Sequence, residues 1–222
     1  MRRYAECTER YAQSKNKMSR KSITIKFLIL FTFLSCTNKK ESPAVIEDEK
    51  QIQEDNWIMT ELKKQLKSTN TTDSIEIYGL PIEDMPELVY QNPKIRYLRI
   101  DCIDFNCMKT LSSRIAQLKY LETLIISKSA LKELPSEIGE LTNLKKLMIL
   151  GGGKLSSIPN EISELEKLEE LDFWRNNLSE FSVHLNNMKH LKLVNLGENK
   201  LSQKYIETMR DRFPGVEIKT HR

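Results

Sequence analysis

Histidine and cysteine, the residues most used in metal sites and nucleophilic catalysis, are scarce in this chain, which has three and four of them among 222 residues. The histidines, His184, His190 and His221, do not stand at metal-like spacings from cysteines or acidic residues. Acidic residues are numerous, but they are spread over predicted strand edges and turns, as solubility requires. We therefore predict no catalytic residues, no metal and no cofactor.

The chain also lacks a long hydrophobic run, and its body, residues 36–222, carries little net charge. The apolar run 27–34 would span about 12 Å as a helix, far short of the roughly 30 Å hydrocarbon core, so a transmembrane helix is not expected. Of the 35 basic and 31 acidic residues, eight and two lie in residues 1–35, which leaves 27 and 29 in the remainder. This near-neutral body argues against a nucleic-acid partner.

The stretch "MSRKSITIKFLILFTFLSC", which begins at Met18, has a basic start followed by the apolar run, as in a signal peptide. Its ending, "FLSC", resembles the bacterial lipoprotein signal, although Phe33 stands where that signal prefers leucine. By that resemblance Ser35 is the last residue removed and Cys36 carries the lipid. The alternative is a buried strand or helix of an N-terminal subdomain, but no matching core surrounds it. Residues 1–17 are polar and unusual before a signal, so Met18 is a candidate translation start within the leader 1–35.

Two further segments precede the repeats. Residues 36–47 are polar and charged, which predicts a flexible tether. Residues 48–71 are predicted to form an N-terminal capping helix, because their apolar residues fall on one helical face, from which Trp57 points away. Those residues are Ile52, Ile58, Met59, Leu62 and Leu66. A membrane-surface helix is the alternative, and the mixed charge of the polar side disfavours it.

From Thr72 onward an apolar pattern restarts in steps of 23, 26, 23, 24 and 23 residues. Each restart carries apolar residues three and five positions later, which predicts a short strand with one buried face. The restarts are Thr72, Ile95, Leu121, Leu144, Leu168 and Leu191. The pattern resembles the leucine-rich repeat family, with the unit L-x-x-L-x-L-x-x-N-x-L, and "LPSEI" and "IPNEI" look like its common bacterial form.

This resemblance covers about residues 72–218 and implies an α/β solenoid of about six repeats in 72–222, with short parallel strands on its concave face. One repeat alone has too small an apolar face to exclude water, so neighbouring repeats must stack. The C-terminal stretch "YIETMRDRFPGVEIKTH" breaks the pattern and is predicted to be a cap, with a helix and a last strand at 216–218.

In that family an asparagine inside each turn bonds the backbone of adjacent coils. The matching positions here are Asn106, Asn176 and Asn199, whereas Leu80, Ser129 and Gly153 depart from the pattern. Two repeats are longer, with three extra residues within 101–105 and one within 150–152. The "GGG" at 151–153 is expected to supply positive φ angles in a bulged turn. No Lys-Ser/Thr pair follows it, which disfavours a phosphate-binding loop.

Cys102 and Cys107 flank the longest insertion, while Cys7 lies in the leader. A bridge between them would close a small loop and could stabilise an exported protein by about 2–3 kcal/mol. Two small buried thiols are the alternative.

The surface that remains for function is the concave face, where side chains alternate with the buried pairs. Aromatic residues, methionine and arginine are enriched in binding patches, although scattered exposed apolar residues are also ordinary. The candidate partner-binding residues are Tyr78, Tyr97, Arg99, Ile125, Met148, Leu150, Trp174 and Arg175. Six strands would offer about 400 Å² of footprint, below the ~800 Å² per partner of a standard interface. A peptide, a loop or a transient contact would fit, and a globular partner would also need the bulged edge.

The sequence thus predicts a monomeric, non-enzymatic module that binds a protein or peptide and is anchored to a bacterial membrane as an exported lipoprotein, periplasmic or surface-exposed. A structural envelope lipoprotein without a specific ligand is one alternative. A cytoplasmic leucine-rich repeat adaptor is another, if the leader is not a signal. An enzyme is disfavoured, because no segment outside the repeats is long enough to fold as a catalytic domain.

Overall fold

The computed structural model describes residues 57–65, 73–181 and 183–220. The chain divides into a unit of residues 1–61 and a unit of residues 62–222, and the second unit contains all the repeats. The expected leader 1–35 and tether 36–47 lie outside the described residues, as does most of the expected capping helix, of which 57–65 is helical. In the described part of the chain, no helix combines the length and apolarity needed to span a bilayer.

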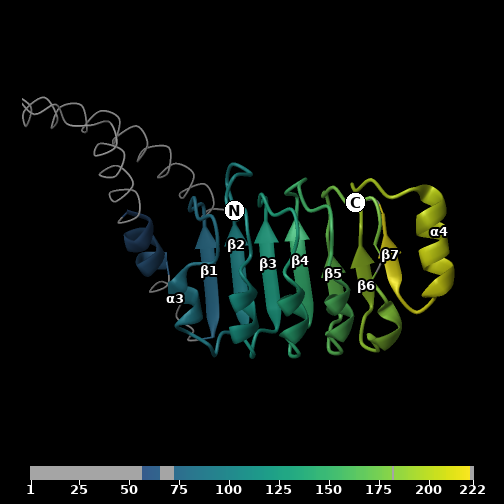
Figure 1. Cartoon of the computed structure of the whole chain (residues 1–222), viewed down its shortest axis with the longest axis horizontal. Helices are drawn as coiled ribbons and strands as arrows, with labels where there is room; N and C mark the ends of the chain where they lie inside the picture. The colour runs from purple at the N-terminus through teal and green to yellow at the C-terminus, as the bar shows by residue number, and fades with distance from the viewer. Residues whose placement is uncertain (1–56, 66–72, 182, 221–222) are drawn as a thin grey trace, which may run out of the picture. The chain divides into compact units, whose positions relative to one another are not determined.

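One parallel sheet organises the repeat unit, and its strand order is the chain order (Figure 1). Neighbouring strands pair at equivalent positions of the repeat, as Leu98 does with Leu124 and Leu124 with Leu147. The strands are β1 (Ser74–Tyr78), β2 (Tyr97–Asp101), β3 (Thr123–Ser127), β4 (Lys146–Leu150), β5 (Glu170–Asp172), β6 (Leu193–Asn195) and β7 (Glu217–Lys219). The predicted α/β solenoid of short parallel strands is therefore confirmed.

Each of the strands β1 to β5 is followed by a return segment that contains a short helical turn (Figure 1). These turns are α3 (Glu87–Tyr90), η1 (Ser113–Gln117), η2 (Ser136–Glu140), η3 (Asn160–Glu164) and η4 (Leu185–Asn187). In the "LPSEI" and "IPNEI" stretches, Pro135 and Pro159 stand immediately before the turn with φ of −68° and −70°. Proline suits that position because its fixed φ is compatible with the turn and its missing N–H is not needed there.

The core lies between the strands and these helical turns. The apolar pairs of the strands are buried, and so are the isoleucines of the helical turns, such as Ile115, Ile138 and Ile162. Burying one such side chain fully contributes about 1.5–3 kcal/mol. Because each coil supplies only a few of these side chains, stacking of neighbouring coils is what encloses them.

Both ends of the repeat unit are covered. Near its start, Leu62 is fully buried, and the side-chain amide of Gln65 bonds the backbone O and N of Tyr78 at 3.1 and 3.0 Å. At the other end, α4 (Gln203–Arg212) begins at Ser202, whose hydroxyl accepts the N–H of Tyr205 at 3.2 Å. β7 then adds to β6 and starts one residue later than the sequence predicts.

Two of the three expected asparagines do bond the backbone inside their turns. Asn176 is 7% exposed, and its Nδ2 donates to the carbonyl O of Ile149 at 2.7 Å and of Phe173 at 3.1 Å. Asn199 Nδ2 donates to Phe173 O at 2.8 Å, and its Oδ1 accepts the N–H of Leu178 at 3.0 Å. These amides therefore link consecutive coils where the backbone turns away from the sheet.

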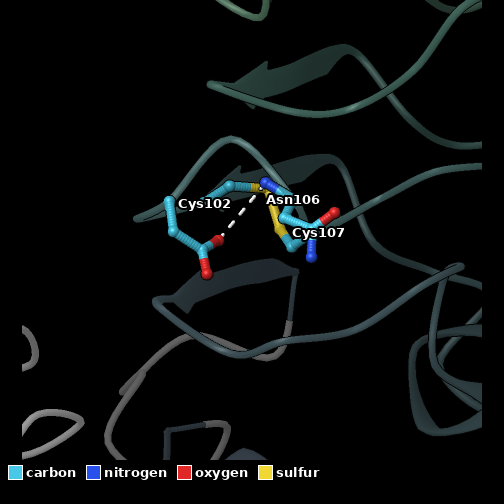
Figure 2. Close-up of a disulfide and its surroundings, with 4 residues drawn as sticks. Cys102, Asn106 and Cys107 are labelled. Atoms are coloured by element: carbon cyan, nitrogen blue, oxygen red, sulfur yellow. Dashed lines mark hydrogen bonds between the residues drawn. A yellow bond between two sulfur atoms is a disulfide. The ribbon is translucent and has the colours of Figure 1, made fainter.

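The prediction for Asn106 is wrong. This residue is exposed, and within the described part of the chain its side-chain amide has no hydrogen-bond partner. Its backbone N–H donates to Asp104 Oδ1 at 3.3 Å (Figure 2). The physical reason is the insertion, which is closed by a disulfide between Cys102 and Cys107, with Cα atoms 5.7 Å apart and both residues buried. The covalent link holds this turn where other coils use an amide.

The glycine-rich turn after β4 takes the expected backbone conformation. Gly151 and Gly153 have φ of 66° and 65°, which glycine adopts without steric cost. Gly152 is constrained differently, because a Cβ at this position would lie 2.4 Å from the carbonyl O of Ser129 in the preceding coil. All three glycines thus have a structural role in the bulge.

We predict that Asn176→Ala lowers the free energy of unfolding by roughly 1–3 kcal/mol, because the carbonyl O of Ile149 loses the Asn176 donor, while that of Phe173 keeps the bond from Asn199. Asn106→Ala is the matched control and should change the free energy of unfolding little, since that amide faces solvent. Urea unfolding of the two variants measures the difference. Equal losses would contradict the assignment of the two turns.

Candidate functional site

The sheet presents one face to the core and the other outward. We call the outward one, which we predicted to be the concave face, the outer sheet face. Its side chains lie in rows across the strands, because the strands pair without a shift in register. One row places Arg99 beside Ile125 and Ile125 beside Met148, and continues to Asp172 and Asn195. A second row runs from Tyr78 through Asp101 and Ser127 to Leu150. The predicted partner-binding residues of the strands therefore share one face.

The apolar centre of this face is formed by β3, by β4 and by Trp174 and Arg175, which lie shortly after β5. Met148 and Leu150 are partly exposed. Ile125 was expected to be a contact residue, but only 9% of its surface is exposed. Its larger neighbours in the row, Arg99 and Met148, flank it on both sides. Ile125 is therefore part of the floor of the surface rather than a projecting contact.

The Trp174 ring lies close to a glycine of each neighbouring coil. A Cβ added to Gly151 would lie 3.8 Å from its ring atom Cζ3, and one added to Gly197 would lie 3.1 Å from Cδ1. These glycines leave room for the indole, which is half-buried. Arg175 follows with φ of 55° and is exposed, and its Cζ lies 5.9 Å from the Trp174 ring centroid. Tryptophan and arginine therefore form one edge of the apolar centre.

Several polar and charged side chains around this centre are paired, although Arg175 has no carboxylate partner within the described residues. Arg99 Nε lies 2.8 Å from Asp101 Oδ2, and Lys146 Nζ lies 2.8 Å from Glu170 Oε2. The Asp172 carboxylate accepts hydrogen bonds from the backbone N–H of Trp174 at 2.9 Å and from Asn195 Nδ2 at 3.1 Å. Burial nevertheless raises the pKa of Asp172 above its ordinary value. A partner that approaches Asp101 or Glu170 thus meets a carboxylate that already has a basic partner.

The two candidate tyrosines lie apart from Trp174, on β1 and β2. The Tyr78 hydroxyl donates to the carboxylate of Glu76 on the same strand, and burial together with this carboxylate raises the pKa of Tyr78. Tyr97 is partly exposed at the start of β2. The structure therefore separates the candidates into two groups, with Tyr78, Tyr97 and Arg99 at one end and Met148, Leu150, Trp174 and Arg175 toward the other.

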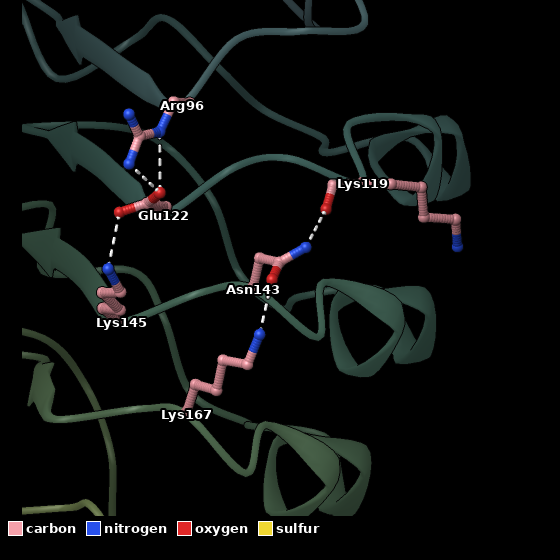
Figure 3. Close-up of polar contacts among 6 residues, drawn as sticks. All are labelled: Arg96, Lys119, Glu122, Asn143, Lys145 and Lys167. Carbon is pink, nitrogen blue, oxygen red and sulfur yellow. Dashed lines mark hydrogen bonds and ion pairs between the residues drawn. The ribbon is translucent and has the colours of Figure 1, made fainter.

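A row of alternating charges precedes the strands, and our reading of the sequence missed it. Arg96 Nε donates to Glu122 Oε1 at 2.7 Å, and Lys145 Nζ lies 2.8 Å from Glu122 Oε2 (Figure 3). The row continues with Lys192 Nζ, 2.7 Å from Glu169 Oε2. Each of these residues directly follows the first apolar residue of a repeat, so their alternation of sign was visible in the sequence.

Asn143 makes a second link between coils on the return side. Its Nδ2 donates to the carbonyl O of Lys119 at 2.8 Å, and its Oδ1 accepts from Lys167 Nζ at 2.7 Å (Figure 3).

Within the described residues, no group of three or more His, Cys, Asp or Glu side chains is placed to hold a metal ion. His184 and His190 are exposed, and His221 lies outside the described residues.

Comparison with known proteins gives the repeats a family. The family model described as "Leucine-rich repeat region" matches residues 86–212. A putative disease resistance protein of Arabidopsis thaliana, At4g19050, is 31% identical over 126 residues, which are 55% of this chain and 10% of that protein. The chain therefore spans about a tenth of the length of this curated relative.

Two solved structures have the same fold. The leucine-rich repeat protein LIC12759 of Leptospira interrogans is 28% identical with a TM-score of 0.54, over 65% of this chain and 36% of that one. The leucine-rich repeat domain of the type III effector XCV3220 (XopL) is 20% identical with a TM-score of 0.57, over 72% of this chain and 55% of that one. The likeness to XopL is one of fold alone.

The paired charges before the strands predict a pH-dependent stability. Hydrogen bonds from Lys145 and Arg96 lower the pKa of Glu122 below its ordinary value of 4.5. A carboxylate whose folded pKa is depressed stabilises the protein above its unfolded pKa, and this contribution is lost as pH falls through the folded pKa. Glu122→Gln should therefore be less stable than the wild type at neutral pH, and the difference should shrink below about pH 4.5.

Denaturant unfolding of both proteins across this pH range measures that difference. Glu180→Gln is the control, since Glu180 is exposed and has no ion-pair partner within the described residues. A gap between Glu122→Gln and the wild type that is constant from neutral to acidic pH would contradict the prediction.

Proposed function

The chain belongs to the leucine-rich repeat family, and from that premise we propose that it is a non-enzymatic module that binds a protein or peptide on the outer sheet face. Leucine-rich repeat domains are commonly protein-interaction modules, and their stacked coils create extended binding surfaces. We assign this role to the surface around Met148, Leu150 and Trp174.

The observation that supports it most is an apolar centre whose neighbouring carboxylates on β2 and β5 are already paired. Met148, Leu150 and Trp174 are partly exposed on adjoining coils, and the nearby carboxylates of Asp101 and Glu170 are paired with basic side chains. Binding energy in protein interfaces is concentrated in a few buried aromatic, aliphatic or arginine side chains, while the surrounding polar residues contribute little. A partner with an apolar side chain and few charges fits this arrangement.

The size of the face favours a small epitope. Strands about 4.8 Å apart give a flat footprint on the order of 400 Å², about half of what each partner buries in a standard interface. A peptide, or a loop that projects from a larger protein, can cover the apolar centre without a wider contact. Only a transient complex is expected if a flat globular surface docks there.

We further propose that the protein is exported and held at a bacterial membrane by a lipid on Cys36, with residues 36–47 as the tether. Two observations support this proposal. The sequence before Cys36 has the order of a lipoprotein signal, with a basic segment, an apolar run and a small residue. The disulfide between Cys102 and Cys107 is of the kind that persists in oxidising compartments, which favours export over a cytoplasmic adaptor.

The binding proposal predicts that Trp174→Asp combined with Met148→Lys abolishes capture of the partner. A buried charge without a counter-charge is strongly unfavourable, so two charges at an apolar contact should weaken binding by several kcal/mol. Crosslinking and pull-down from intact cells, with wild type and variant in parallel, measures the capture.

Circular dichroism must show that this double variant is folded. Leu147→Ala is the matched control on the same strand, because Leu147 points into the core. It should lose roughly 2–5 kcal/mol of stability yet keep its partner under conditions where it is folded. If the double variant folds and still captures every wild-type partner, the face is not the binding surface, and a structural lipoprotein becomes the better account.

The anchoring proposal predicts that Cys36→Ser abolishes labelling by a fatty-acid analogue and releases the protein from membranes. Cys7→Ser, a change in the leader, should leave both labelling and membrane association intact. Metabolic labelling and membrane fractionation of the three proteins make the test. A wild-type protein that takes no label, together with a Cys36→Ser variant that stays on the membrane, would rule out the lipid anchor.

A further inference from the structure

A groove lies between the second and third repeats, on the return side of the solenoid and away from the outer sheet face. It has a volume of about 590 Å³ and is lined by residues 106 and 109–111 of the second repeat, 130 and 132–135 of the third and Lys154 of the fourth. This volume is within the range of about 300–1,000 Å³ that ligand sites occupy.

The groove has a structural cause in the backbone. Two other pairs of neighbouring repeats have backbone bonds beyond the turn. The first and second are joined by Lys109 N to Glu83 O at 2.8 Å, and the third and fourth by Ser156 N to Lys132 O at 2.9 Å. The second and third repeats are joined at Ala130 N to Cys107 O, at 2.8 Å. Beyond that point, no backbone hydrogen bond joins 108–111 to 131–135 in the described chain. The two segments are therefore free to leave a space between them.

The groove combines an apolar floor with a basic rim. Leu111 and Leu134 are almost fully buried, at 6% and 5% exposure, whereas Lys109, Lys132 and Lys154 are exposed. Lys109 is paired with Glu83, but neither Lys132 nor Lys154 has a carboxylate partner within the described residues. Glu133 is the one acidic residue of the lining. The two unpaired ammonium groups contrast with the paired lysines around the outer sheet face.

The disulfide-closed loop adjoins this groove. Phe105 is 42% exposed and has φ of 59°, and it directly precedes Asn106, which lines the groove. A loop constrained by the Cys102–Cys107 bridge loses less conformational entropy when a partner binds than a free loop does. The Asn106 side-chain amide, which faces solvent, can bond the backbone of an extended chain.

We propose that this groove, together with Phe105, is a second docking surface that takes an extended acidic segment of a partner polypeptide. Carboxylates of the segment would pair with Lys132 and Lys154, and an apolar side chain between them would pack on Leu111 and Leu134. Charge complementarity selects the occupant, because the rim offers two unpaired positive charges beside an apolar floor. The surface differs from the outer sheet face, where Lys146 is paired with Glu170 and Arg99 with Asp101.

The test begins with selection of peptides from a displayed random library on the immobilised full-length protein. Selected peptides should be enriched in Asp and Glu interspersed with apolar residues. Their affinity for Lys132→Glu combined with Lys154→Glu should fall by roughly tenfold or more. It should also fall with added salt, because exposed charges are screened.

A matched control carries Lys189→Glu combined with Lys204→Glu, which changes the net charge equally at exposed lysines outside the groove. This control should bind the acidic peptides as the wild type does. The variant Trp174→Asp with Met148→Lys should also keep them, which separates this proposal from the one for the outer sheet face.

Three results would overturn the acidic-peptide assignment. The selection could yield no acidic peptides, or acidic peptides could bind the Lys132→Glu and Lys154→Glu variant as tightly as the wild type. A single-stranded oligonucleotide that competes for the groove as strongly as the selected peptides would instead identify it as a general polyanion site.

Discussion

Burial of strand leucines and isoleucines between adjacent coils is the interaction on which this structure depends. A single coil cannot exclude water from side chains such as Leu124 and Leu147, so each coil must cover its neighbour. Their complete burial requires that consecutive strands stay in register, because a shift of one residue would turn the apolar set outward. The same constraint aligns the outward side chains into rows, and the candidate binding surface is made of those rows.

The constraint explains why much of the fold could be predicted from the sequence. Spacing of the apolar residues located the six repeat strands and their outward side chains, and the last strand lies one residue from its expected place. Side-chain packing could not be predicted in the same way. Asn106 matches a family position, but the inserted residues and the Cys102–Cys107 bridge turn it to solvent. Ile125 alternates correctly, yet its neighbours on two other coils nearly bury it.

The features that our reading of the sequence missed depend on contacts between coils. The space for the Trp174 ring comes from Gly151 and Gly197, which lie more than 20 residues away on either side. The charge row of Arg96, Glu122 and Lys145 similarly joins residues one repeat apart. Periodicity aligns such residues in space, so comparing equivalent positions of successive repeats would have revealed the alternating charges. The ring contacts depend on side-chain size and orientation, which periodicity does not give.

Pairing of charges divides the surface into regions with different chemistry. Around Met148 and Trp174 the carboxylates have partners on the same sheet, so an incoming polypeptide gains from apolar contact there. At the groove between the second and third repeats, Lys132 and Lys154 have no such partners in the described chain, and charge can contribute to recognition. The two surfaces that we propose for recognition therefore differ in their chemistry.

The central claim, that the outer sheet face holds the partner, is tested most directly by site-specific photo-crosslinking in intact cells. A photoreactive amino acid would replace Met148 on the outer sheet face in one protein, and exposed Glu164 at the end of η3 in another. The account predicts a discrete crosslinked product from position 148 and none from position 164. A product from position 164 with none from position 148 would contradict it.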